Sequence, residues 1–338
     1  MYIIGVDPHR GSHVAVVLDE REQIHDELAV TANRLQRQRL LDWASRYQPR
    51  LWAIEGAAGT GALLAQQLVA AGEQVIDVPP ALAARVRLLD NEHRSKTDRH
   101  DARSVAVAAQ RKRGLRHVAV EDQAAVLRLL AKRHHDLVAG RTRAVCRLHS
   151  ILCYLAEGHF PKRLRADQAA AILSRIHPTS EVARQRKRLA REHLAEVRRF
   201  DTALAELEQR IRSAVAASGS SVTAVHGVGP IMAAYLIGYT GDIGRFPSAG
   251  HYARYNGTAP IDASSGSHIR HRLNPDGNRQ LNHALYVAAL GQISHNTAGR
   301  EYYLRKQAEG HSRKEALRAL KRRISDAVYR QLQADTRR

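Results

Sequence analysis

Three apolar segments joined by short turns occupy the first 31 residues of the chain. Residues 2–7, 12–20 and 23–31 each have the length of a strand, and only a few residues separate one from the next. Links this short join neighbouring antiparallel strands, because a parallel connection needs a dozen residues or more. The start of the chain is therefore predicted to be an antiparallel meander.

Helices and strands alternate after this meander. The predicted elements are, in order, a helix over 32–48, a strand over 50–55, a helix over 61–72, a strand over 73–80 and a helix containing 96–114, which ends near Gly114. Three antiparallel strands followed by alternating helix and strand form the element order of an RNase H-like α/β domain. Such a fold can carry many activities, so the function depends on its side chains.

Acidic residues lie at the ends of two of these strands. Asp7 ends the first strand and Glu55 ends the fourth, and in an RNase H-like sheet these two strands are neighbours. Asp98 and Asp101 are three apart in a helix, which places both on one face with their Cβ atoms about 5–6 Å apart. Each acid alone has an ordinary role, such as capping a turn or facing solvent. Together they would repel one another and bind protons more tightly, unless a cation neutralised them.

A divalent cation is the expected partner of this acid set. Mg²⁺ prefers oxygen ligands and often combines carboxylates with substrate phosphates. Two such ions about 3.5–4 Å apart can clamp the entering and leaving oxygens of a phosphodiester. We therefore predict that the four carboxylates bind Mg²⁺, with Mn²⁺ as a substitute. Lys96 and Arg99 flank the acids, and they either contact phosphates or are solvated.

Basic residues are concentrated in two parts of the chain, whose formal net charge is +20. Residues 1–110 hold 13 Lys and Arg against 14 Asp and Glu, whereas residues 111–212 hold 23 against 11 and residues 299–338 hold 12 against 5. A generally basic proteome would spread the charge evenly, and the near-neutral first 110 residues argue against that. Because Lys and Arg displace the counterions condensed on polyphosphates, we expect a nucleic-acid partner.

Two long helical patterns lie in the middle of the chain. Apolar residues step by three and four over 123–157 and again over 193–211, as in heptad seams. Prolines between them enforce turns, so we expect two long antiparallel helices with a helical tip. His134 and Arg141 fall on the first seam. They either fix the register or the oligomeric state, or belong to an ordinary intramolecular hairpin.

The last third of the chain begins after a linker at 217–221. Gly227 and Gly229 lie between two apolar helical stretches, as in a helix-hairpin-helix that offers backbone N–H groups to a phosphate. A plain tight turn is the alternative. The final segment, 313–332, is a basic amphipathic helix. Nucleic acid is its expected partner rather than a membrane surface, since its apolar face lacks Trp and Phe.

Small and polar residues dominate the segment 256–286. Its serines are Ser264, Ser265 and Ser267 around Gly266, and its basic residues include Arg270, His271, Arg272 and Arg279. Guanidinium groups beside a serine could hold a phosphate and absorb the charge that develops on it. From the residues alone, however, a flexible serine-glycine loop beside a basic helix is the favoured interpretation, because no acid-base partner for a serine is evident.

The cysteines and the apolar segments indicate the compartment. Cys146 and Cys153 are the only two cysteines, and their spacing of seven in a helical pattern fits neither a disulfide framework nor a zinc site. We expect reduced cysteines in the core of a cytoplasmic protein. No apolar stretch approaches the roughly 18 residues of a membrane span, and the first ten residues lack the features of a signal peptide.

Five motifs resemble those of one known family, the transposases of insertion sequence family 110, which include the Piv-type DNA invertases. They are "GVD" at 5–7, "IEG" at 54–56, "KTDRHDA" at 96–102, "HGVGP" at 226–230 and "YNGTAPIDASSG" at 255–266. The resemblance implies a RuvC-like catalytic domain over 1–114, a basic coiled-coil region over 115–216 and a mainly helical C-terminal transposase domain over 217–338. By position it implies a DEDD-type acid tetrad of Asp7, Glu55, Asp98 and Asp101 and a nucleophilic Ser265, with Ser264 as the adjacent alternative.

The same resemblance implies a function. A member of this family is expected to break and rejoin DNA as a homo-oligomer, a dimer or a tetramer, guided by an RNA that is encoded beside the gene. Two other interpretations stay open from the sequence. One is a metal-dependent nuclease of the Holliday-junction resolvase type, in which water replaces the serine. The other is a non-catalytic nucleic-acid scaffold, which the complete acid set makes less favoured.

Overall fold

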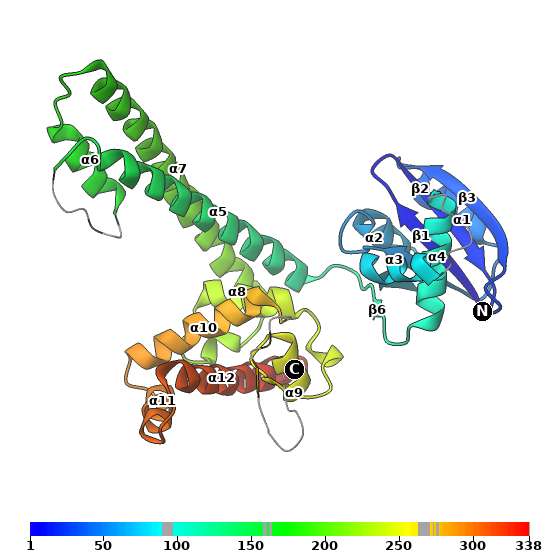
Figure 1. The fold of residues 1–338 in the computed structure, drawn as a ribbon. Coiled ribbons are helices and arrows are strands. Elements are labelled where there is room, and N and C mark those ends of the chain that lie inside the picture. Colours follow the sequence, from blue (N-terminus) through cyan, green and yellow to red (C-terminus); the bar gives the residue numbers. More distant parts are fainter. Residues whose placement is uncertain are drawn as a thin grey trace. The chain divides into compact units, whose positions relative to one another are not determined.

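The computed structural model describes residues 1–89, 97–157, 161, 164–262, 271–272, 274 and 277–337. The chain divides into two compact units, Met1–Glu121 and Asp122–Arg338 (Figure 1). The predicted domain boundaries at 114/115 and 216/217 stay predictions. None of the helices within the described ranges is long and apolar enough to cross a membrane.

The first unit is built on a mixed sheet in the order β3-β2-β1-β4-β5-β6. Its strands are β1 (Tyr2–Pro8), β2 (Ser12–Leu18), β3 (Ile24–Thr31), β4 (Arg50–Glu55), β5 (Val75–Val78) and β6 (Arg116–His117). The first three strands pair antiparallel, β4 lies parallel to β1, β5 lies parallel to β4, and β6 closes the edge antiparallel to β5. This order and these directions confirm the predicted RNase H-like fold.

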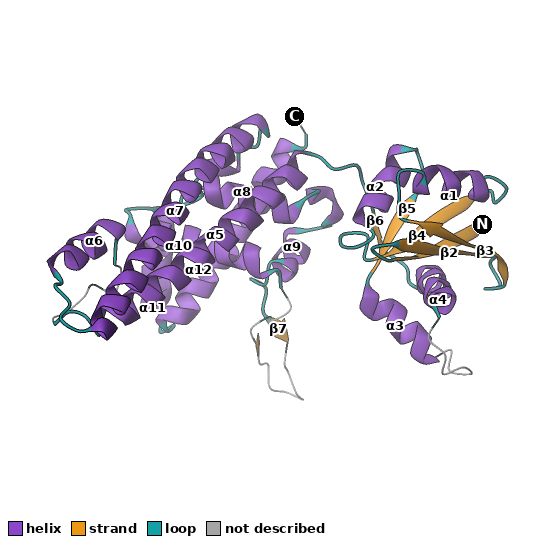
Figure 2. Cartoon of the chain, turned by 90° about the horizontal axis from the view of Figure 1, so that it is seen from above, coloured by secondary structure: helices purple, strands orange, loops and turns teal. Residues whose placement is uncertain are grey.

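Helices cover both faces of this sheet (Figure 2). One face carries α1 (Gln36–Ala44) and α2 (Ala62–Ala70), and the other carries α3 (Pro80–Leu89) and α4 (Asp98–Arg111). Successive strand residues point to opposite faces, so Ile4 and Val6 pack with the first helix pair while Ile3 packs with the second. The sheet is thus buried on both sides.

Helix α3 and strand β6 were not predicted from the sequence. The predicted strand over 73–80 ends at Val78, because α3 begins at Pro80. Proline suits the first helical position, where its missing N–H is not needed and its fixed φ is already helical. The two-residue strand β6 is too short to leave a periodic signal in the sequence.

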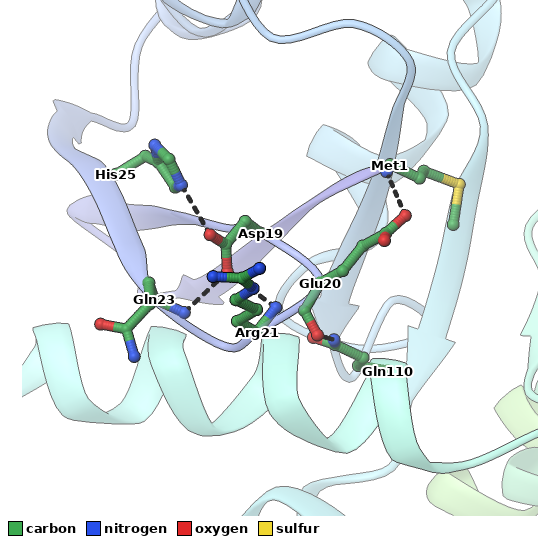
Figure 3. Close-up of polar contacts among 7 residues, drawn as sticks. All are labelled: Met1, Asp19, Glu20, Arg21, Gln23, His25 and Gln110. Atoms are coloured by element: carbon green, nitrogen blue, oxygen red, sulfur yellow. Dashed lines mark hydrogen bonds and ion pairs between the residues drawn. The ribbon is translucent and has the colours of Figure 1, made fainter.

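The turn between β2 and β3 is fastened to the end of α4 (Figure 3). The Asp19 carboxylate accepts hydrogen bonds from the backbone N–H groups of Arg21 and Gln23, at 2.8 and 2.9 Å. The next carbonyl, that of Glu20, accepts one from the side chain of Gln110 at 2.7 Å. These contacts hold the carboxyl end of α4 against the sheet.

The second unit begins with a long antiparallel helix pair. Figure 1 shows α5 (Gln123–Leu152) beside α7 (Glu181–Ala217), with α6 (Ala166–Arg175) at their far end, as the expected helical tip. Gly140 of α5 faces the ring of Phe200, and Arg141 pairs with Asp201 on α7. His134 contacts the hydroxyl of Tyr235. Both polar seam residues therefore have partners within their own chain, as in an intramolecular hairpin.

The remaining helices form one core with the ends of α5 and α7. They are η1 (Val222–Ala224), α8 (Pro230–Thr240), η2 (Ile243–Arg245), α9 (Ala249–Tyr255), α10 (Arg279–Ser294), α11 (Ala298–Ala308) and α12 (Arg313–Asp335), with the strand pair β7 (Ile261–Asp262) and β8 (His271–Arg272). The apolar face of the basic final helix, α12, is buried in this core at Leu320, Ile324 and Val328.

The expectation that both cysteines lie in the core is wrong. Cys146 and Cys153 are free thiols, as predicted, but both are exposed on the α5 segment. The buried stripe of this helix runs through Ala144, Leu148 and Leu152, and neither cysteine falls on it. Helical spacing predicted which face of this helix is buried, but not that the buried face is too narrow to include the two cysteines.

Candidate metal centre

The two strand-end acids lie at the same edge and on the same face of the sheet. In the parallel pair of β1 and β4, Val6 lies opposite Ile54. Asp7 and Glu55 are the next residues on the two strands, so they lie side by side at the same edge of the sheet. Asp7 has the same side-chain parity as Ile3, which packs towards α4, and Glu55 has the parity of Ala53, which also packs there. Both carboxylates therefore point to the side of the sheet that α4 covers.

The amino end of α4 supplies the other two acids. Thr97 caps this helix by accepting a hydrogen bond from the N–H of His100 at 3.3 Å. Asp98 and Asp101 lie in its first turn, where the positive end of the helix dipole favours negative charge. Asp101 is buried, as is Asp7, whereas Asp98 is exposed. The helix thus presents one acid to the sheet and one to solvent.

The four carboxylates influence one another electrostatically. Burial raises the pKa of Asp7 above its ordinary value, and the charges of Asp101 and Asp98 raise it further while His9 lowers it. Burial also raises the pKa of Glu55, and the neighbouring charges of Asp7 and Asp101 add to that shift. The two strand-end acids and the two helix acids therefore lie near one another. Among the described residues, however, only Asp7 and Asp98 belong, with His9, to a group whose potential ligand atoms all lie within 4.8 Å, and Glu55 and Asp101 fall outside it.

Two basic side chains reach into the acid set. Nε2 of His9 lies 3.1 Å from Oδ2 of Asp7 and 3.6 Å from Oδ1 of Asp98. One potential ligand atom from each of these three residues falls within 4.8 Å of the others. Nη1 of Arg87, on α3, lies 3.0 Å from Oδ1 of Asp101. The guanidinium group of Arg87 partly neutralises the buried Asp101.

The donor set fits a hard divalent cation. Oδ2 of Asp7 and Oδ1 of Asp101 are buried, and in place of a hydrogen bond from the described residues each has one ion-pair neighbour, Nε2 of His9 at 3.1 Å and Nη1 of Arg87 at 3.0 Å. The fit to a cation therefore rests on the donor type, several carboxylates close together, and not on an oxygen without a partner. Carboxylate oxygens are also the ligands that Mg²⁺ and Mn²⁺ favour.

Sequence reasoning missed His9 and Arg87. A signal for His9 was available, because it stands two residues after Asp7 in "DPHR" and an extended chain places such residues on one side. Arg87 left no signal, since its helix α3 was not predicted and its partner Asp101 is 14 positions away.

The other residues that the sequence predicts to contact DNA or phosphate have different outcomes. Nε of Arg99 forms an ion pair with Oε2 of Glu27 on β3, at 2.5 Å. Lys96 lies outside the described residues, as do Ser264, Ser265 and Arg270. Arg272 belongs to β8, where its backbone pairs with Ile261, and its side chain is likewise outside the described part. Arg279 is the first residue of α10.

The two glycines of the predicted hairpin have different surroundings. Gly227 has φ +83°, and a Cβ placed there would lie 2.4 Å from the carbonyl oxygen of Ala288 on α10. Gly229 is the N-cap of α8, and nothing lies within 4 Å of the position of its missing Cβ. A single turn of 3₁₀ helix, Val222–Ala224, precedes them. Close packing requires the first glycine, and only the second borders an open helix N-terminus.

Comparison with known proteins gives two family matches and two long relatives. The family model described as "Transposase", that of the IS110-type DEDD transposases, matches residues 4–155, and the model described as "Transposase IS116/IS110/IS902 family" matches residues 220–304. A 44.8 kDa protein of insertion element IS116 from Streptomyces clavuligerus is 25% identical over 375 residues, which span 97% of this chain and 94% of the relative. A 42 kDa protein of insertion element IS900 from Mycobacterium paratuberculosis is 29% identical over 332 residues, 83% of this chain and 82% of the relative.

Among solved structures, a RuvC from T. thermophilus in complex with a Holliday junction substrate is similar to part of the chain. The likeness covers 35% of this chain and 99% of the other, with 17% identity and a TM-score of 0.29.

Proposed function

The chain belongs to the IS110 family of transposases, and on that premise we propose that it breaks and rejoins DNA strands at the acid set of Asp7, Glu55, Asp98 and Asp101. The observation that carries this proposal is the gathering of four acids, two of them buried, at one edge of an RNase H-like sheet. Carboxylates are expensive to bring together, so the arrangement favours a site that receives positive charge.

The four carboxylates are the residues that would hold Mg²⁺ or Mn²⁺. A bound divalent cation supplies Lewis-acid stabilisation of the charge that develops on a phosphodiester. His9 contacts the carboxylates of Asp7 and Asp98, and Arg87 forms an ion pair with Asp101 that a metal ion would compete with. Burial on the α4 face limits the access of water to Asp7 and Asp101.

The proposed nucleophile is Ser265, with Ser264 as the alternative; both lie outside the described residues. In the first step the serine Oγ forms a bond to phosphorus, the bond from phosphorus to the leaving strand oxygen breaks, and that oxygen takes up a proton. In the second step a hydroxyl of another strand attacks the same phosphorus and releases the serine. Both steps exchange one phosphodiester for another, so the bond energy is retained.

DNA is the proposed substrate, and a guide RNA encoded beside the gene is a proposed partner. The support within this chain is the excess of basic residues in 111–212 and 299–338, which suits proteins that hold nucleic acids by their phosphate backbone. A homo-oligomer, a dimer or a tetramer, is the proposed assembly.

The test uses a nicked suicide DNA substrate that cannot be rejoined, incubated with protein, guide RNA and Mg²⁺. We expect a covalent protein–DNA adduct that mass spectrometry places on Ser265. The adduct should be lost in Ser265→Ala and in Asp7→Asn, and kept in the matched control Ser267→Ala.

The products distinguish this proposal from a hydrolytic nuclease. A nuclease that activates water would give free DNA ends without attached protein, and Ser265→Ala would cleave normally. An adduct that persists in Ser265→Ala but disappears in Ser264→Ala would move the nucleophile by one residue. Strand joining by Asp7→Asn at the normal rate would rule out a catalytic role for the acid set.

A further inference from the structure

A cavity of about 790 Å³ lies in the second unit, between α10, α12 and the residues that follow α9. One wall is formed by Arg279, Asn282, His283 and Tyr286 of α10, and the opposite wall by Arg318, Lys321 and Arg322 of α12. These residues follow the spacing of three and four that defines a single helix face. Helix α12 therefore turns three basic side chains, and α10 one arginine, towards a common space.

Among the described residues, only one of the four Lys and Arg side chains that line this cavity has an acidic partner. Nζ of Lys321 donates a hydrogen bond to the amide oxygen of Asn282 at 2.6 Å. In the described part of the chain, no carboxylate lies within ion-pair distance of Lys321, Arg318 or Arg279. Of the cavity's cations, Arg322 does have such a partner, Asp326, at 3.2 Å. Burial and the charge of Arg318 lower the pKa of Lys321.

A buried polar network fixes the position of Lys321. Asn282 donates a hydrogen bond from Nδ2 to the carbonyl of Asn256 at 3.0 Å. Asn256 is fully buried and donates in turn to Oγ of Ser325 on α12 at 2.7 Å. The ammonium group is thus held in one place at the cost of desolvation. An arrangement of this kind favours an anionic ligand, because a half-buried cation without a counter-charge is costly by itself.

The rim of the cavity carries an aromatic platform. Tyr286, one turn beyond Asn282 on α10, keeps 40% of its surface exposed although it is large and apolar. Every nucleobase can stack on an aromatic ring, and a basic groove beside such a ring is the usual arrangement for holding an unpaired strand. An unpaired base can stack on such a ring, whereas the bases of a duplex are already stacked on one another.

We propose that this cavity binds an unpaired DNA strand, with one backbone phosphate held by Lys321, Arg318 and Arg279 and the adjoining base stacked on Tyr286. The inference rests on the proposed function, since it takes the substrate to be DNA. DNA is favoured over RNA because the cavity wall includes Pro260 and Asn274, which flank in sequence the segment that carries the proposed nucleophile.

Binding is measured with the full-length chain in EDTA, by fluorescence anisotropy of a labelled single-stranded DNA over a range of salt concentrations. We expect Lys321→Gln and Arg318→Gln each to weaken binding by about 10-fold, as for the loss of a hydrogen bond to a charged group. The slope of log K against log salt should fall by about 1 for each variant. Arg330→Gln removes the same charge from an exposed position of α12 outside the cavity, and should leave both quantities nearly unchanged.

A local measurement separates this cavity from other basic surfaces. Single-stranded DNA that contains 5-bromodeoxyuridine is irradiated on the protein, and mass spectrometry locates the cross-link. We expect an adduct on Tyr286 that is lost in Lys321→Gln, while the melting temperature of that variant does not fall. Equal losses of affinity in Arg330→Gln and the cavity variants, or no adduct near Tyr286, would overturn the proposal.

A second comparison uses RNA of the same sequence. If the cavity variants weaken binding of RNA but not of DNA, the assignment to a DNA strand is wrong. None of these measurements requires metal or catalysis, and they are repeated in Asp7→Asn. Failure of the cavity proposal therefore leaves the proposed chemistry of the acid set standing, and failure of that chemistry leaves the binding result unaffected.

Discussion

A Cβ atom placed on Gly5 would lie 2.2 Å from the carbonyl oxygen of Ala102. The first residue belongs to β1 and the second to α4, so the missing side chain allows helix and strand to touch backbone to backbone. Asp7 follows on the strand and Asp101 precedes on the helix. The distance between the two buried acids therefore depends on the absence of a side chain at position 5.

Substitution of this glycine is predicted to damage both the fold and the acid set. Gly5→Ala should lower the free energy of unfolding by about 1–3 kcal/mol, because the new methyl group forces α4 away from the sheet. Mn²⁺ affinity, measured by isothermal titration calorimetry, should fall with it. Gly11→Ala is the matched control, since nothing lies within 4 Å of its missing Cβ. Equal Mn²⁺ affinity in both variants would show that the spacing between helix and strand does not set the site.

Asp7→Asn is predicted to stabilise the metal-free protein at neutral pH. The pKa of Asp7 is raised in the folded state, so protonation of this residue stabilises the fold below its ordinary value of 3.8, and that stability is lost as the pH rises through the raised value. Asparagine does not titrate and avoids this loss. In thermal melts with EDTA, the variant should melt above the wild type at neutral pH, and the difference should shrink as the pH falls.

Metal should reverse that order. Addition of Mg²⁺ should raise the melting temperature of the wild type by mass action and leave Asp7→Asn almost unaffected. A variant that melts below the wild type in EDTA at neutral pH would mean that the contact with His9, at 3.1 Å, stabilises ionised Asp7 more than burial destabilises it.

Removal of Arg87 is predicted to tighten metal binding. Nη1 of Arg87 lies 3.0 Å from Oδ1 of Asp101, and the charge of Arg87 opposes the rise in the pKa of Glu55 that burial causes. Arg87 therefore competes with any other cation for the charge of these two carboxylates. Arg87→Met keeps most of the side-chain volume and should lower the dissociation constant for Mn²⁺ several-fold. Arg85→Met, on the same helix, serves as the control. Weaker Mn²⁺ binding in Arg87→Met would show that Arg87 acts chiefly by orienting Asp101.

The first unit could be predicted from the sequence because its signals are local. The runs of residues 2–7 and 50–55 are apolar and bounded by turns, and their order alone places Asp7 beside Glu55. Asp98 and Asp101 could be assigned to one helix for the same reason. The ion pair of Arg87 with Asp101 could not, because it joins two helices whose packing angle no single-sequence pattern specifies.

The second unit shows a different limit. Heptad spacing predicts the buried residues of α5 and α7, but it cannot tell a partner in the same chain from a second copy. The pairing of Arg141 with Asp201 is visible only once the two helices are aligned. Likewise, the cavity at Lys321 depends on the packing of α10 against α12, two helices that each read as ordinary basic amphipathic segments.

Substitutions of the two glycines before α8 can distinguish a role of this turn in packing from a role in phosphate binding. Gly227 has φ +83° and contacts the backbone of Ala288, so Gly227→Ala combines a left-handed conformation with a steric overlap. We expect a loss of more than about 2 kcal/mol in urea denaturation, with or without DNA. Gly229→Ala meets open space at a helix N-cap and should cost less than about 1 kcal/mol. If Gly227→Ala instead kept its stability and lost DNA affinity, the turn would act by binding phosphate rather than by packing against α10.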